Sequence, residues 1–181
     1  ALAAALAAPM AAVAQPRAEG LANIETYIAY EKGFSGCVVI SHQGKVMFEK
    51  CRTAEGGPQL TPQTVFPLAS LSKAVAAAVA YKLVEQGKLS LDAPLAPLLP
   101  EAPAAWAPGL TLRRLLTHTS GLPAFDWASI QGLAKPLAGL VAHHAALAPG
   151  KVDEFRYNNL DFILLELALA RASGHPQGFA G

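Results

Sequence analysis

A serine and a lysine three residues apart, Ser70 and Lys73, form the clearest potential catalytic pair in the sequence. Residues at i and i+3 of a helix share one face, with Cβ atoms about 5–6 Å apart. In a first helical turn, the serine oxygen also lies near the positive end of the helix dipole. A lysine amine in a desolvated pocket can accept the hydroxyl proton. The pair predicts an activated serine nucleophile, although Ser70 as a helix cap and Lys73 as a solvated side chain would give the same spacing.

A second group that could do chemistry is Tyr157-Asn158-Asn159. At this composition, chance gives roughly 0.35 Ser-x-x-Lys pairs but only roughly 0.07 Tyr-x-Asn triplets. A phenol beside a cationic lysine shifts toward phenolate and can act as a general base or acid. The amide of Asn159 can bind a substrate carbonyl or orient Lys73. In the alternative interpretation, Tyr157 is an aromatic core residue and Asn159 is only a helix cap.

His118 lies between these two groups, in the segment Leu-Leu-Thr-His-Thr-Ser-Gly-Leu-Pro at residues 115–123. The pattern is that of a helix end followed by a turn. We therefore expect His118 to be a hydrogen-bonded turn histidine and not a catalytic one.

The helix that must carry the Ser-Lys pair is predicted over residues 70–86, with Gly87 as its C-terminal cap. Its many alanines suggest close packing on several sides, and hence a buried helix. Five prolines predict loops and short turns over residues 89–108. Three further helices are expected: residues 112–116 after the cap Thr111, residues 136–147, and residues 160–172 after the cap Asn159.

Two β-rich runs, residues 36–41 and 46–50, predict a hairpin flanked by Cys37 and Cys51. A two-residue loop would place the cysteines on opposite faces, and a three-residue loop would place them opposite each other. We expect free buried thiols, with a disulfide as the alternative in an exported protein. Neither cysteine has the spacing of a metal ligand, so no metal is expected.

The first 14 residues are apolar and end in Ala12-Val13-Ala14, which resembles the core and cleavage site of an export signal. We interpret residues 1–16 as the remnant of such a signal and expect a periplasmic or secreted protein. The alternative is an Ala-rich amphipathic helix of the fold. The stretch is too short for a stable membrane span.

Composition limits the remaining classes of protein. Hydrophobic residues make up 52% of the 181 residues, which excludes a disordered chain. The formal net charge of +1 argues against a nucleic-acid-binding protein. The expected elements are one hairpin and four helices, and the two strands of a single hairpin make only a marginal sheet. We therefore expect residues 17–181 to be the N-terminal part of a single larger domain.

Three motifs in order resemble the serine β-lactamase and penicillin-binding-protein-like superfamily, most of all its branch of class C β-lactamases, esterases and D-aminopeptidases. They are Phe-Pro-Leu-Ala-Ser-Leu-Ser-Lys at residues 66–73, the 115–123 segment, and Phe-Arg-Tyr-Asn-Asn at residues 155–159. The resemblance implies an α/β (α+β) fold in which an antiparallel sheet joins a helical subdomain, here truncated before its C-terminal strands.

The resemblance also implies a role for each residue of the two motifs. Ser70 would be the acylated nucleophile, Lys73 its partner base and Tyr157 a proton shuttle, while Asn159 would line the substrate site. The Ser70 backbone N–H and one from a C-terminal strand would form the oxyanion hole. The substrate would be a small-molecule or peptide acyl compound, namely an ester, a β-lactam or a D-amino-acid peptide, and no cofactor is implied.

The sequence departs from the family in three respects, one of which is a longer stretch than usual, residues 151–154, between Pro149-Gly150 and Phe155. The family carries a third motif, Lys or His followed by Thr/Ser-Gly, well beyond its Tyr-x-Asn, and nothing after Asn159 matches it. Asn158 also stands where a serine is common. Loss of one oxyanion donor costs about 10²–10³-fold in rate. We therefore expect poor activity from these 181 residues alone, and the alternative function is a non-catalytic binding or scaffold domain.

Overall fold

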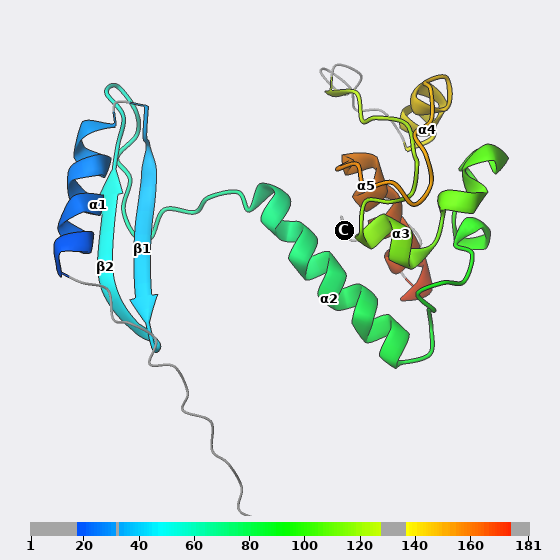
Figure 1. Ribbon diagram of the computed structural model, residues 1–181, viewed down its shortest axis with the longest axis horizontal. Coiled ribbons are helices and arrows are strands. Elements are labelled where there is room, and N and C mark those ends of the chain that lie inside the picture. Colours follow the sequence, from blue (N-terminus) through cyan, green and yellow to red (C-terminus); the bar gives the residue numbers. More distant parts are fainter. Residues whose placement is uncertain (1–17, 32, 128–136, 175–181) are drawn as a thin grey trace, which may run out of the picture. The chain divides into compact units, whose positions relative to one another are not determined.

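The computed structural model describes residues 18–31, 33–127 and 137–174. It contains two compact units, Ala1–Pro67 and Leu68–Gly181, and each is described by itself (Figure 1). The interpreted export signal, residues 1–16, lies outside the described residues. None of the helices in the described ranges is long and apolar enough to cross a bilayer.

The first unit is a helix packed against a hairpin (Figure 1). Helix α1 (Ala18–Tyr30) lies along strand β2 (Lys45–Arg52), which pairs antiparallel with β1 (Gly36–His42). The guanidinium of Arg52 holds the end of α1 by donating to the carbonyl of Glu31 at 2.6 Å.

The sequence prediction of four helices missed α1. Its signal is the spacing of Leu21, Ile24 and Ile28, which places these three side chains on one helical face, the face that packs against the hairpin. Ile28 is the most buried of the three.

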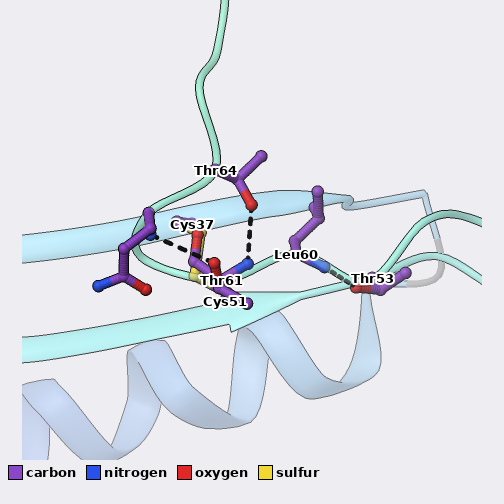
Figure 2. Close-up of a disulfide and its surroundings, with 7 residues drawn as sticks. Cys37, Cys51, Thr53, Leu60, Thr61 and Thr64 are labelled. Carbon is purple, nitrogen blue, oxygen red and sulfur yellow. Dashed lines mark hydrogen bonds between the residues drawn. A yellow bond between two sulfur atoms is a disulfide. The ribbon is translucent and has the colours of Figure 1, made fainter.

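The hairpin shows that the expectation of free thiols was wrong, because Cys37 and Cys51 form a disulfide (Figure 2). The turn is the two-residue type, Gln43-Gly44, with both residues at positive φ. That turn alone would separate the cysteines. A β-bulge next to Ile40 shifts the register by one residue, since Met47 is extra on its strand, and Cys37 then faces Cys51.

The second unit is helical, and its short elements confirm most of the sequence prediction. Thr111 caps its helix by accepting a hydrogen bond from the backbone N–H of Arg114, as expected. The proline-rich stretch forms short 3₁₀ turns and an isolated β-bridge from Pro94 to Thr111. The elements are η1 (Ala69–Leu71), α2 (Ser72–Glu85), η2 (Ala96–Leu98), η3 (Ala104–Gly109), α3 (Leu112–Leu116), α4 (Leu137–Ala145) and α5 (Asn159–Ala172).

The buried helix of this unit is α5 and not α2, which corrects the prediction. Most of α5 between Leu160 and Ala170 is buried. Helix α2 packs against α5 but buries only Ala76, Ala80 and Leu83. The alanines of α2 therefore allow a close approach on one side, and the rest of the helix surface is exposed or half-buried.

The disulfide can be checked by counting thiols. Protein prepared without reductant and then unfolded should show no free thiol, and reduction should release the two sulfhydryl groups of Cys37 and Cys51. The bond joins residues 14 apart, so its reduction should lower the free energy of unfolding of the first unit by about 3 kcal/mol. Free thiols in the unreduced, unfolded chain would contradict the observed pairing.

Candidate active site

Ser70 lies in the 3₁₀ turn η1, which leads directly into α2. Ala69 before it has a φ of 45°, a left-handed conformation that costs an alanine about 1–2 kcal/mol. The hydroxyl of Ser72 supports this turn by donating to the Ala69 carbonyl at 2.6 Å. Strained backbone of this kind concentrates at functional sites. The turn leaves Ser70 exposed at the N-terminal end of a 14-residue helix.

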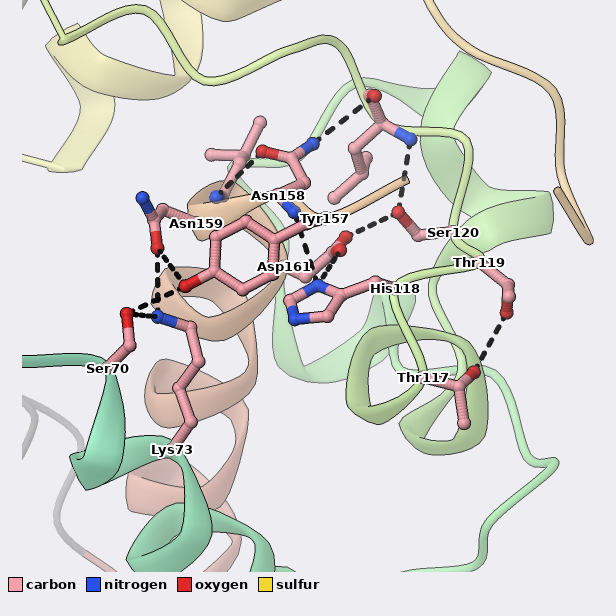
Figure 3. A network of polar contacts seen from close by, with 12 residues as sticks. Ser70, Lys73, Thr117, His118, Thr119, Ser120, Tyr157, Asn158, Asn159 and Asp161 are labelled. Atoms are coloured by element: carbon pink, nitrogen blue, oxygen red, sulfur yellow. Dashed lines mark hydrogen bonds and ion pairs between the residues drawn. The ribbon is translucent and has the colours of Figure 1, made fainter. Parts of the chain in front are cut away.

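The structure brings together the four residues that the sequence indicated as the candidate site: Ser70, Lys73, Tyr157 and Asn159 (Figure 3). The Ser70 hydroxyl lies 2.7 Å from the phenol oxygen of Tyr157. The amine of Lys73 donates to Ser70 Oγ at 3.2 Å and to Asn159 Oδ1 at 2.8 Å. The two motifs are more than 80 residues apart in the chain, yet they form one continuous set of hydrogen bonds.

The donors of this network have a definite direction. A lysine ammonium has three donors and no lone pair, so Lys73 donates both of its bonds. The hydroxyl hydrogen of Ser70 is then free to point at Tyr157. The Tyr157 hydroxyl can in turn donate to Asn159 Oδ1, which lies 3.4 Å away. The Ser70 hydrogen is therefore directed at the phenol oxygen, which can accept the proton when Tyr157 is in its phenolate form.

The surroundings of Tyr157 favour its phenolate form. The hydrogen bond with Ser70 lowers the pKa of Tyr157 most, the hydrogen bond and positive charge of Lys73 lower it further, and only slight burial opposes them. The Lys73 nitrogen also lies 5.2 Å from the centre of the Tyr157 ring. The Tyr157 side chain is half exposed, so an incoming carbonyl can reach it.

The start of α5 corrects one detail of the sequence prediction, because Asn158 and not Asn159 caps the helix. Asn158 Oδ1 accepts from the backbone N–H of Leu160 at 3.0 Å. Its amide nitrogen donates to the Pro123 carbonyl at 2.8 Å. Because Asn158 satisfies the helix end, the amide of Asn159 is available to Lys73.

His118 is a hydrogen-bonded turn histidine, as the sequence predicted. Its Nδ1 lies 2.8 Å from Oδ2 of Asp161, and the other oxygen of Asp161 accepts from the Ser120 hydroxyl (Figure 3). Burial raises the pKa of Asp161. Sequence reasoning missed Asp161, although a carboxylate between Leu160 and Phe162 in an apolar helix marks a buried charge that needs partners.

Comparisons with known proteins find matches over most of the chain. A family model described as Beta-lactamase matches residues 6–179. The D-alanyl-D-alanine-carboxypeptidase/endopeptidase AmpH of Escherichia coli strain K12 is 32% identical in an alignment of length 169, and the match covers 83% of this chain and 42% of AmpH. Esterase EstB of Burkholderia gladioli is 35% identical in an alignment of length 100, and the match covers 51% of this chain and 26% of EstB. The chain thus spans less than half the length of either relative.

Solved structures confirm the fold class predicted from the sequence, α/β (α+β) with helices and an antiparallel sheet. A class C β-lactamase in complex with cefoxitin is 26% identical and matches with a TM-score of 0.68, over 85% of this chain and 44% of that one. The D-amino acid amidase from Ochrobactrum anthropi SV3 is 22% identical with a TM-score of 0.70, over 86% and 45% of the two chains, which shows a shared fold.

The different roles of the two asparagines, Asn158 as helix cap and Asn159 as partner of Lys73, can be tested by measuring stability. Asn158→Ala removes the helix cap and a buried hydrogen bond, and should lower the free energy of unfolding by about 2 kcal/mol. Asn159→Ala removes neither and should change it by less than about 0.5 kcal/mol. Urea unfolding followed by circular dichroism measures both. A larger loss of unfolding free energy for Asn159→Ala than for Asn158→Ala would indicate that Asn159 is the helix cap.

The state of Tyr157 is testable by ultraviolet titration. The difference between wild type and Tyr157→Phe isolates one phenol, whose midpoint should lie below the ordinary tyrosine pKa of about 10. Ser70→Ala should raise that pKa, because it removes the hydrogen bond that contributes most to the shift. A midpoint at or above the ordinary value in the folded wild type would show that the observed contacts do not favour phenolate.

Proposed function

The chain belongs to the β-lactamase family, and we propose that the protein is a serine hydrolase that works by acyl transfer. The observation that carries this proposal is the placement of the Ser70 hydroxyl 2.7 Å from the Tyr157 oxygen and 3.2 Å from the Lys73 amine. A serine hydroxyl within hydrogen-bond reach of a base, itself held by a third group, is the arrangement of an activated nucleophile.

Acylation begins with proton transfer from Ser70 Oγ to the phenolate oxygen of Tyr157. Oγ forms a bond to the substrate carbonyl carbon, and the carbonyl electron pair moves onto its oxygen. The Ser70 backbone N–H, near the positive end of α2, stabilises that oxyanion. When the carbonyl reforms, the bond to the leaving nitrogen or oxygen breaks, and Tyr157 returns the proton to the departing atom.

Deacylation repeats these steps with water in place of Ser70. Tyr157 takes a proton from the attacking water, the tetrahedral intermediate forms, and Ser70 leaves as its oxygen regains the proton. Lys73 assists Tyr157 as its cationic partner, since its ammonium donates to Ser70 Oγ and its positive charge favours the phenolate, which is the base. Asn159 orients Lys73 through the 2.8 Å hydrogen bond and lines the substrate side of the network.

We propose that the substrate is an acyl compound of small-molecule or peptide type: an ester, a β-lactam or a D-amino-acid peptide. The names of the two relatives support this range, since AmpH is a D-alanyl-D-alanine carboxypeptidase and endopeptidase and EstB is an esterase. All of these substrates present a carbonyl carbon with a leaving nitrogen or oxygen, which is what an activated Ser70 attacks.

We also propose that the protein is exported to the periplasm or secreted, with residues 1–16 as the remnant of its signal and residues 17–181 as the N-terminal part of one hydrolase domain. The Cys37–Cys51 disulfide supports export, because such bonds persist in oxidising compartments.

The proposed nucleophile is tested by covalent labelling of the full-length protein with a fluorescent penicillin and with a fluorophosphonate. Ser70→Ala should abolish labelling. Tyr157→Phe should slow it by about 10²–10⁴-fold, because the phenol oxygen is the proton acceptor. The rate in wild type should rise with pH through the lowered pKa of Tyr157, since the phenolate is the active form.

Tyr81→Phe is the matched control, because Tyr81 is an exposed tyrosine on α2. This variant should be labelled at the wild-type rate. Labelling that persists in Ser70→Ala would remove Ser70 as the nucleophile. Folded wild-type protein that reacts with neither probe would favour the alternative, a non-catalytic binding or scaffold domain.

A further inference from the structure

We propose that His118 is a positioning residue for Tyr157: together with the carboxylate of Asp161, it fixes the phenol in the direction that presents its oxygen to Ser70. This role rests on the function proposed above. His118 does not contact Ser70 in the described structure, and it acts through the segment that carries Tyr157.

His118 holds the backbone on both sides of Tyr157. Its carbonyl accepts from the backbone N–H of Arg156 at 2.8 Å. The backbone N–H of Asn158 lies 3.3 Å from its Nδ1. The residue before Tyr157 is therefore hydrogen-bonded to His118 and the residue after it lies against the imidazole, which restricts how the intervening residue can turn.

The imidazole ring of His118 also packs against the phenol ring of Tyr157. Its centre lies 4.6 Å from the centre of the Tyr157 ring and 5.3 Å from that of Phe162. The His118 side chain is only 11% exposed, whereas Tyr157 is half exposed. The buried ring thus supports one face of an exposed catalytic side chain, and a tyrosine without that support would sample other rotamers.

Asp161 fixes the orientation of the imidazole itself. A ring nitrogen has one in-plane bonding direction, so the 2.8 Å contact between Nδ1 and Asp161 Oδ2 is the principal bond and the contact with Asn158 is the weaker one. The Ser120 hydroxyl donates to the second oxygen of Asp161, which holds the carboxylate in place. Asp161 is fully buried, so water does not compete for these bonds.

The turn that carries His118 is seated firmly on the segment before Tyr157. His118 has a φ of 56°, in the left-handed region where histidine and asparagine are enriched. Gly150 donates to the Gly121 carbonyl at 3.0 Å, and a Cβ at Gly121 would meet the Val152 nitrogen at 2.7 Å. The two backbones are therefore in direct contact, and a displacement of His118 is transmitted to Tyr157.

The test compares three variants of the full-length protein. His118→Ala removes both the ring and its hydrogen bond. His118→Asn keeps an amide donor that can reach Asp161 and tolerates the left-handed backbone. His143→Ala is the control, since His143 lies on α4 and contacts Asp126 instead of this cluster. Each variant is measured by phenol titration against its own Tyr157→Phe background, by the rate of labelling and by thermal unfolding.

His118→Ala should return the pKa of Tyr157 toward about 10, because the phenol no longer keeps its contacts with Ser70 and Lys73. The acylation rate should fall by about 10²-fold, as expected for a misplaced catalytic group, with KM little changed. His118→Asn should restore most of the titration shift and part of the rate. His143→Ala should match the wild type in both.

A purely structural role predicts a different pattern. The variants would then unfold at lower temperature, while the folded fraction kept the wild-type titration and the wild-type rate per labelled site; that result would overturn the proposal. If His118→Ala does not fold, Asp161→Leu is the second variant, since it removes the hydrogen-bond partner of His118 Nδ1 from the buried site; an unchanged titration there would equally overturn the proposal. The titration needs no substrate. If the protein reacts with no probe, the proposed function is contradicted, but the titration still shows whether His118 positions Tyr157.

Discussion

Lys73 joins the two segments that form the proposed site, because its amine donates both to Ser70 at the start of α2 and to Asn159 at the start of α5. Each helix begins with backbone N–H groups and a partial positive charge. Two helix ends and one lysine thus favour negative charge at the same place. The phenolate of Tyr157 and the oxyanion of an acyl-transfer intermediate are the anions that such a field stabilises.

This arrangement depends on how closely α2 approaches α5. The two helices are in contact, and Ala76 and Ala80 of α2 belong to the same core as Leu165 and Ala168 of α5. Small side chains on α2 let the helix axes come close, which brings the two N-terminal ends within the reach of one lysine. The alanines of α2 are therefore better explained by the geometry of the site than by burial of the helix on all sides.

The sequence predicted those features that depend on neighbours along the chain. Ser70 and Lys73 are one helical turn apart, so their contact follows from local geometry. The choice between Asn158 and Asn159 as helix cap could not be predicted in this way, because both are good capping residues and Lys73 selects between them from 86 residues away. The disulfide escaped prediction for a similar reason, since one extra residue, Met47, changes which side chains face each other.

Asp161 shows why a residue absent from the sequence-based site can still matter to it. A carboxylate at a fully buried position pays a desolvation penalty that an apolar residue would avoid. Its bonds to His118 and Ser120 offset that penalty but do not make it the more stable choice for a core. The carboxylate fixes the rotation of the His118 ring through a directional hydrogen bond. An apolar side chain at this position could pack against the imidazole without setting its rotation. The rotation of that ring determines the surface against which Tyr157 rests, and so the line from the phenol oxygen to Ser70.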